Sequence, residues 1–181
     1  MVEVTVIDMA RIQFSEFLRR IPAYDVVEKY AERTNVLCGV QVDDLFSLPY
    51  WHVKKTIPDL IELGKYEEAF SLIVPELELK EIQKADNYSK ASFYFWVLDQ
   101  YKLIIELEKN NLKSSIDPKL INAGIKKMEV LGDFPLIDSI ARDYNYTHDE
   151  AKMLPYETVF QIQLKNKIEN DVNKKLEEQR K

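Results

Sequence analysis

The sequence predicts a mainly α-helical protein: a compact multi-helix domain with a minor two-stranded β element and a long projecting C-terminal helix. Three observations carry this prediction. Apolar residues recur at helical spacing through most of the 181 residues. Residues that start and stop helices divide the chain into segments of helical length. Alternation of apolar and polar residues, which is typical of half-buried strands, occurs in two short stretches.

The two alternating stretches are the predicted strands. Met1–Asp8 places Val2, Val4 and Val6 on one face, and Val36–Val42 alternates around a central glycine. A two-stranded ribbon by itself is only marginally stable in water. We therefore expect the two strands to pair with each other; the alternative is that the first strand lies on a neighbouring subunit.

Five helices are predicted in the first part of the chain. Pro58 should kink or divide the third, and the last is apolar on more than one side, which is typical of a central core or interface helix. The predicted helices are Phe14–Arg20, Pro22–Arg33, a helix from a cap at Ser47 to Leu63, Lys65–Val74, and Ser89–Lys109 with Ser89 as its cap.

The second part carries clear helix-start signals. Asp117-Pro118 begins a helix that Gly132 ends, and Phe134-Pro135 opens Leu136–Tyr144. Thr147–Glu150 fits a capping box. Pro155 opens the last helix, which extends almost to Lys181. The predicted regions are 1–110 and 116–181, which together can also form one single domain.

One phrase occurs twice: Leu48-Pro49-Tyr50 is echoed by Leu154-Pro155-Tyr156. Proline in the first helical turn sets φ and gives up an N–H that has no partner there. Each copy is therefore predicted to start a helix, and the aromatic residue after it to fix how the helix enters the core.

The last helix has an apolar stripe that cannot face one flat partner throughout. Its members recur every four residues, and four steps of about 100° overshoot a full turn, so the stripe winds around the helix. The stripe is Phe160, Leu164, Ile168, Val172 and Leu176. With the first strand and the aromatic helix starts, it supplies the candidate interface residues, which are Val2, Val4, Val6, Tyr50, Trp51, Tyr156, Ile168, Val172 and Leu176.

Composition excludes several function classes. Four glycines are too few and too scattered for a phosphate-binding or dinucleotide-binding loop. A net charge of −6 argues against coating nucleic acid. A single cysteine, Cys38, indicates a reducing compartment, and within its predicted strand it is expected to be buried rather than a reactive thiolate. We find neither a secretory signal nor an apolar run that would span a membrane.

Catalysis and metal binding lack candidates in the sequence. His52 and His148 do not show the ligand spacing of zinc motifs with Cys38 or with Asp43-Asp44. We therefore expect no catalytic residue, no metal and no cofactor. Leu136–Leu164 has the outline of a helix-turn-helix, but acidic residues at the start of its second helix would be repelled by DNA.

Two segments carry a resemblance to small bacteriophage morphogenesis proteins. Lys54–Pro75, with its Ile-Pro-Asp-Leu-Ile-Glu-Leu-Gly-Lys-Tyr-Glu-Glu-Ala run, resembles a turn followed by an acidic, aromatic helix in such proteins. Ile140–Asp171 is similar to the C-terminal region of phage tail-assembly chaperones. The Lys-, Asn-, Ile- and Tyr-rich composition resembles that of proteins of crAss-like phages of gut Bacteroidetes, whose tails carry rings of small helical proteins.

The resemblance implies a non-enzymatic virion structural protein, a ring or connector component of the portal–tail assembly that is made in the host cytoplasm. Its partners would be copies of itself in a ring and portal or other tail proteins, with no sequence-specific nucleic-acid recognition and no membrane. The alternatives are a cytosolic tail-assembly chaperone and, third, a helix-turn-helix DNA-binding regulator.

Overall fold

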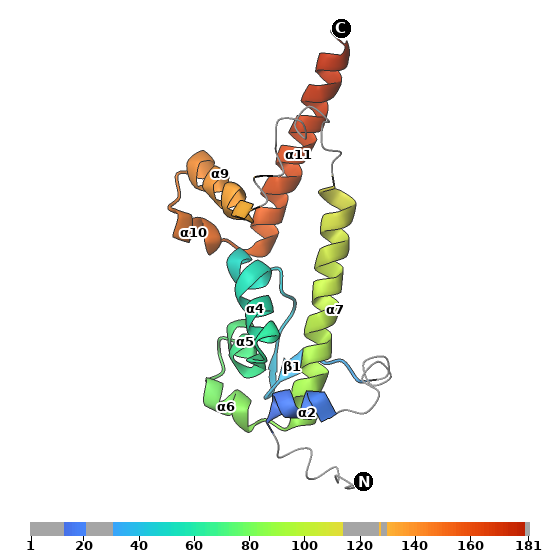
Figure 1. Ribbon diagram of the computed structural model, residues 1–181, viewed down its shortest axis with the longest axis vertical. Helices are drawn as coiled ribbons and strands as arrows, with labels where there is room; N and C mark the ends of the chain where they lie inside the picture. Colours follow the sequence, from blue (N-terminus) through green and yellow to red (C-terminus); the bar gives the residue numbers. More distant parts are fainter. Residues whose placement is uncertain (1–12, 21–30, 114–126, 128–129, 180–181) are drawn as a thin grey trace. The chain divides into compact units, whose positions relative to one another are not determined.

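The computed structural model describes residues 13–20, 31–113, 127 and 130–179 (Figure 1). Two compact units contain them: Met1–Leu48 with His52–Ile104, and Pro49–Trp51 with Ile105–Lys181. The described part is mainly helical, with a two-stranded antiparallel sheet and a long C-terminal helix, α11 (Tyr156–Gln179). This confirms the predicted fold class. The first predicted strand, Met1–Asp8, lies outside the described residues, as do most of the helices predicted at Pro22–Arg33 and Asp117–Leu131.

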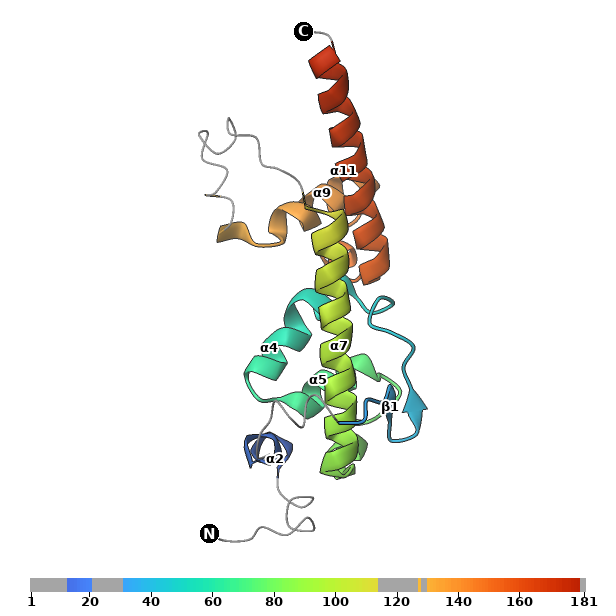
Figure 2. The same ribbon diagram turned by 90° about the vertical axis from the view of Figure 1, so that its right-hand side faces the viewer.

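Helices of the first unit pack around the N-terminal part of its longest helix, α7 (Figures 1 and 2). Phe14 and Phe17 of the short helix that precedes the sheet are buried. The elements of this unit are α2 (Phe14–Arg20), β1 (Val36–Leu37), β2 (Val40–Gln41), η1 (His52–Thr56), α4 (Ile57–Glu62), α5 (Tyr66–Ile73), α6 (Leu79–Lys84) and α7 (Asn87–Asn111), the last continuing into the second unit.

Aromatic rings on three of these helices form the core of the first unit. The Phe14 ring meets Tyr66 edge-on, with ring centroids 5.4 Å apart. Phe70 meets Phe93 in the same way at 5.2 Å and 89°. Edge-to-face packing aligns the positive edge of one ring with the negative face of the next. The aromatic residues of α7 thus belong largely to the core.

The prediction of a single strand at Val36–Val42 is wrong, because this segment forms a hairpin of two short strands. Val36 pairs with Gln41 and Leu37 with Val40. Between them Cys38 and Gly39 both have positive φ, at 49° and 82°, which is the geometry of a tight hairpin turn. The turn changes which residues face inward, so Leu37 is buried and Cys38 is exposed, contrary to the predicted burial of the cysteine.

Two predicted helix starts also shift. The chain becomes helical at Tyr50 rather than after Ser47, because the Asp44 side chain accepts the N–H of Phe46 at 2.8 Å and holds this segment in a turn. α7 begins at Asn87, two residues before Ser89. Its cap is Asp86, whose carboxylate accepts the N–H of Ser89 at 2.9 Å.

The predicted division at Pro58 is present. η1 is a π-helical segment that ends immediately before α4. Proline removes one N–H and crowds the carbonyl four residues before it, and a local π turn accommodates such a defect. Gly64, at φ 74°, follows the end of α4.

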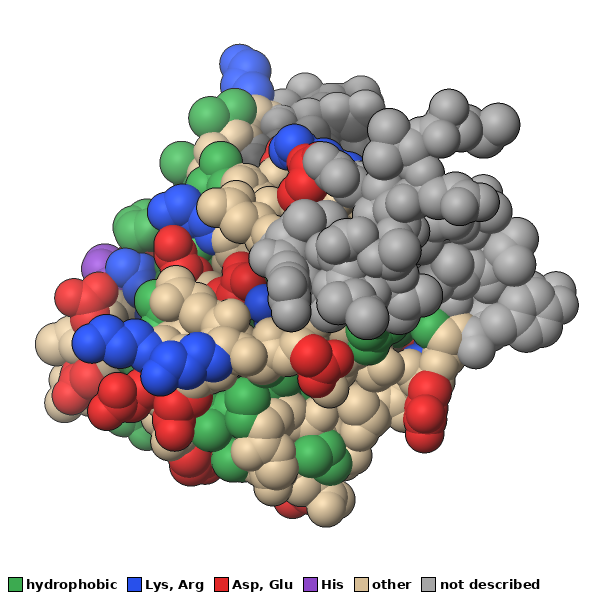
Figure 3. Space-filling view, turned by 90° about the horizontal axis from the view of Figure 1, so that it is seen from below, with side chains coloured by type: hydrophobic (Ala, Val, Ile, Leu, Met, Phe, Trp, Pro, Cys, Tyr) green, Lys and Arg blue, Asp and Glu red, His purple; other side chains and the backbone are tan. Residues whose placement is uncertain are grey.

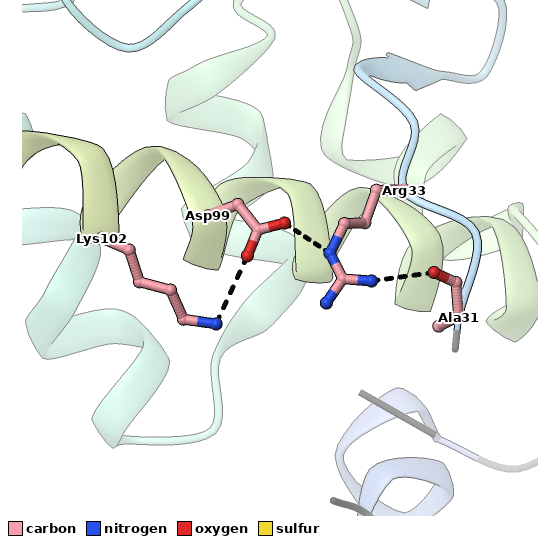
Figure 4. A network of polar contacts seen from close by, with 4 residues as sticks. All are labelled: Ala31, Arg33, Asp99 and Lys102. Atoms are coloured by element: carbon pink, nitrogen blue, oxygen red, sulfur yellow. Dashed lines mark hydrogen bonds and ion pairs between the residues drawn. The ribbon is translucent and has the colours of Figure 1, made fainter. Parts of the chain in front are cut away.

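Polar contacts attach the loop before the sheet to α7 (Figure 4). The Arg33 guanidinium donates to the Asp99 carboxylate and, at 2.9 Å, to the carbonyl oxygen of Ala31. Lys102 lies 3.3 Å from the other Asp99 oxygen. The guanidinium carbon of Arg33 also lies over the Phe95 ring, 5.9 Å from its centroid. This one side chain thus joins the loop to a carboxylate and to an aromatic ring of α7.

In the second unit, α9 (Phe134–Tyr144), α10 (His148–Lys152) and α11 follow one another through short turns. Asn145 ends α9 in the left-handed conformation, at φ 57°. The predicted capping box is confirmed: Thr147 accepts the N–H of Glu150, and the Glu150 carboxylate accepts the N–H of Thr147 at 2.8 Å.

A buried ion pair generates a stability prediction for the first unit. Lys90 is 3% exposed, and its Nζ lies 3.0 Å from Glu67 Oε1 and 5.3 Å from the centroid of Phe14. Removing Glu67 leaves the buried charge of Lys90 uncompensated, whereas removing Lys90 leaves a carboxylate whose side chain is 21% exposed to water. We predict that Glu67→Gln lowers the free energy of unfolding by about 3–5 kcal/mol, whereas Lys90→Met costs much less.

Urea unfolding followed by circular dichroism measures both values. The matched control is Glu68→Gln, which removes an exposed carboxylate 3.3 Å from Lys65 and should cost at most about 1 kcal/mol. Equal losses in the Glu67 and Glu68 variants would contradict the prediction.

Candidate functional site

The Pro-Tyr parts of the two Leu-Pro-Tyr copies meet in the second unit. Pro49 and Pro155 form an isolated antiparallel bridge, and the Tyr50 N–H donates to the Leu154 carbonyl oxygen at 2.7 Å. Proline has no N–H, so its neighbours must supply the hydrogen bonds of such a bridge. Each phrase precedes a helix start, as predicted; their pairing was not predicted.

The tyrosines of the two phrases stack at the centre of this pairing. The Tyr50 and Tyr156 rings lie 6.0 Å apart with an interplanar angle of 10°. Tyr50 donates its hydroxyl hydrogen to Asp133 Oδ1 at 3.3 Å, and Tyr156 donates to Glu108 Oε1 at 2.7 Å. Both residues are only 1% exposed. They are therefore core residues of this unit. An interface residue needs an exposed side chain, and neither tyrosine has one.

Burial and neighbouring carboxylates keep both phenols neutral. Burial is the main cause that raises the pKa of Tyr50 above its ordinary value of 10.0, and the negative charge of Asp133 adds to it. Burial also raises the pKa of Tyr156, followed by its hydrogen bond to Glu108. A neutral phenol can donate to a carboxylate, whereas a phenolate cannot.

Trp51, the next candidate along the chain, is half-buried beside α10. Lys152 Nζ lies 5.4 Å from the centroid of its ring, a cation–π distance, and 3.1 Å from Asp149 Oδ1. Part of the indole is therefore covered by this unit's own lysine.

The three remaining candidates among the described residues lie on the surface of α11. Tyr156 and Val159, near the start of the helix, are buried, whereas Ile168, Val172 and Leu176 are 53%, 51% and 46% exposed. These three are large apolar side chains in one row at four-residue spacing. Scattered exposed apolar residues are ordinary, whereas these three form one continuous apolar row along the helix. Val2, Val4 and Val6 lie outside the described residues.

A groove lies at the other end of this helix. It has a volume of about 410 Å³, and the rings of Tyr144 and Tyr146 on its wall stack 6.4 Å apart at 17°. Both tyrosines are exposed. The groove is lined by Tyr144, Tyr146, Leu154, Thr158, Gln161, Ile162 and Lys165.

The α9–α10 hairpin does not have the electrostatics of a DNA reader. α10 has five residues, and Asp149 and Glu150 occupy its first turn, where a recognition helix places groups that contact bases and phosphates. His148 Nε2 lies 3.2 Å from Asp138 Oδ1. On the face of the molecule seen in Figure 3, basic side chains are interspersed with acidic ones.

The thiol of Cys38 and the imidazole of His52 both have shifted pKa values. Burial and the charge of Glu81 raise the pKa of the Cys38 thiol, which disfavours the nucleophilic thiolate. Burial lowers the pKa of His52. Among the described residues, no three His, Cys, Asp or Glu side chains gather as metal ligands would. None of the helices described combines the length and apolar character that crossing a membrane requires.

Comparison with known proteins returned no matching family model, no matching curated protein and no matching solved structure.

The paired tyrosines generate a prediction for alkaline pH. In the unfolded chain tyrosines ionise near pH 10, whereas in the folded chain both pKa values lie higher. Their contribution to stability is therefore complete below pH 10 and is lost as pH rises above it, at about 1.4 kcal/mol per pH unit for each tyrosine.

Tyr156→Phe tests this sign. The variant loses the hydrogen bond to Glu108, so we expect its free energy of unfolding at neutral pH to fall by about 1.5–3 kcal/mol. Above pH 10 its stability should decline less steeply than that of the wild type, because one perturbed phenol is missing. Urea unfolding at several alkaline pH values measures both slopes, and parallel curves would contradict the assignment.

Proposed function

We propose that this chain is a non-enzymatic structural protein of a phage virion. It works as a ring or connector component of the portal–tail assembly and packs against copies of itself and against portal or other tail proteins. Its place of action would be the virion after synthesis in the host cytoplasm. The chemistry of the protein is then non-covalent docking.

One observation carries the docking part of this proposal: the exposed row Ile168, Val172 and Leu176 on α11. The first turns of α11 already pack against its own unit. The fold therefore does not require apolar side chains on the exposed later turns. Full burial of such a side chain is worth about 1.5–3 kcal/mol, and at half exposure each of the three forgoes roughly half of that. A partner that covers the row recovers part of that energy.

The phage part of the proposal rests on the sequence resemblance. It is supported by Lys54–Pro75, which spans α4 and α5, and by Ile140–Asp171, which spans the α9–α10 turn and most of α11. The acidic net charge of −6 favours protein partners over nucleic acid.

A tail-assembly chaperone is the second candidate, and the groove walled by Tyr144 and Tyr146 favours it. Two stacked, exposed tyrosine rings offer a rigid amphipathic surface on which an extended segment of a client protein can lie. Such a protein would be monomeric or dimeric and absent from finished particles.

Native mass measurement of the full chain tests the proposal. We expect species larger than a dimer, and Val172→Asp should reduce them because it places a charge in the apolar row. Val172 is half exposed, so the helical circular dichroism signal should not change. Lys174→Asp, on the opposite face of α11, is the matched control and should assemble as the wild type does.

Mass spectrometry of purified virions separates the two candidates. Stoichiometric presence of the chain supports the connector. Its absence, together with a monomeric or dimeric native mass, would exclude the connector and leave the chaperone.

A further inference from the structure

We propose that the partner of the exposed α11 row is α11 of a second copy, packed antiparallel about a two-fold axis that passes beside Val172. The inference rests on the proposed function only in taking the partner to be a copy of this chain. It adds the partner surface, the direction and the register of the contact. A two-fold contact joins copies in pairs, so a ring requires a second, different contact between the pairs.

The apolar row fits its own reversed copy. Reversing α11 about Val172 places Ile168 opposite Leu176 of the partner subunit and Val172 opposite its own counterpart. All three exposed apolar residues then lie in the contact. Side chains at four-residue spacing form one of the two ridges of a helix surface, and two such ridges interdigitate at a crossing angle of about −50°. The winding of the stripe therefore suits a crossed helix pair.

The charged flanks select the antiparallel direction. At about 100° per residue, Asp171 and Lys175 lie on one side of Val172, and Glu169 and Asn173 lie on the other. An antiparallel two-fold axis brings each flank against the same flank of the second copy. Asp171, whose carboxylate already lies 2.9 Å from Lys167 Nζ of its own helix, then also faces the partner's Lys175, and the symmetry makes this second pair twice.

A parallel pair would have the opposite electrostatics. A two-fold axis along the helices brings each flank against the other flank of the second copy, so Asp171 would face the partner's Glu169. Like charges at such flanking positions disfavour a helix pair, and opposite charges favour it. The sequence of α11 is thus complementary to itself in one direction only.

The size of the contact limits its strength. A helix pair that meets over three turns buries less than the roughly 800 Å² per partner of a stable interface. We therefore expect a dissociation constant in the micromolar range or weaker for α11 alone. In an assembly, further contacts between the same copies raise its effective strength.

Disulfide trapping in the full chain tests the register. The exposed Cys38 is first replaced by Ser, and single cysteines are placed at 168, 172, 176 and, as the control, at 174 on the opposite face. A disulfide forms only where two Cβ atoms approach within about 3.5–4.5 Å. We expect Val172→Cys to cross-link with itself, and Ile168→Cys to cross-link with Leu176→Cys when the two variants are mixed.

Each other pattern overturns the inference. Self-cross-linking at 168, 172 and 176 alike would show a parallel pair. Cross-linking at 174 equal to that at 172 would show random collision. No cross-link together with a native mass above a dimer would refute the α11 contact and leave the proposed function standing, whereas no cross-link in a monomeric protein would refute both.

A charge reversal tests the flank pairs separately. Lys175→Glu should slow trapping through Val172→Cys by about fivefold, because two attractions become two repulsions. Adding Asp171→Lys should restore part of the rate. Restoration is incomplete because the same change removes the ion pair with Lys167 and places two lysines four residues apart. Lys174→Glu makes the same charge change one residue away, on the far face, and should leave the rate unchanged. If Lys174→Glu slows trapping as much as Lys175→Glu does, the flank assignment is refuted.

Discussion

The second unit depends on the pairing of its two Leu-Pro-Tyr segments. The Pro49–Pro155 bridge and the hydrogen bond from Tyr50 to Leu154 join segments that are distant in the sequence. Stacked tyrosines fill the space beside the bridge, and their hydroxyls satisfy carboxylates before α9 and near the end of α7. Burying two tyrosines is favourable only because both hydroxyls find partners. One cluster therefore sets where α11 begins and which of its faces lies inward.

The position of this cluster at the start of α11 explains why the first turns of the helix are buried and the later turns are exposed. Its first turns bury Tyr156 and Val159, while the later turns carry mixed charge and the exposed row. Ion pairs such as Lys167–Asp171, at 2.9 Å, support the helix locally. They do not account for apolar residues at half exposure. The helix is thus held at one end by its own unit and presents a self-complementary surface along the other.

The first unit is held together by aromatic packing and by ion pairs. Its aromatic core is closed by charged side chains with specific partners: Lys90 with Glu67, and Arg33 with Asp99. A buried ion pair adds little net stability over an apolar pair, but breaking it is costly. Such pairs favour one arrangement of helices over its competitors. The proposed docking function requires a body of fixed shape, and these contacts stabilise the packing of the first unit.

Much of the helical architecture follows from local sequence. The helix Phe14–Arg20, the Thr147–Glu150 capping box and the start of α11 after Pro155 were all predictable, because caps and proline act within one turn. Local pattern could not decide the partner of the repeated phrase, nor that alternation around Gly39 is a hairpin, because pairing depends on residues distant in the chain. The same holds for exposure. Tyr50, at a helix start, and Ile168, on the helix predicted to project, were both interface candidates, and tertiary packing buried only the first.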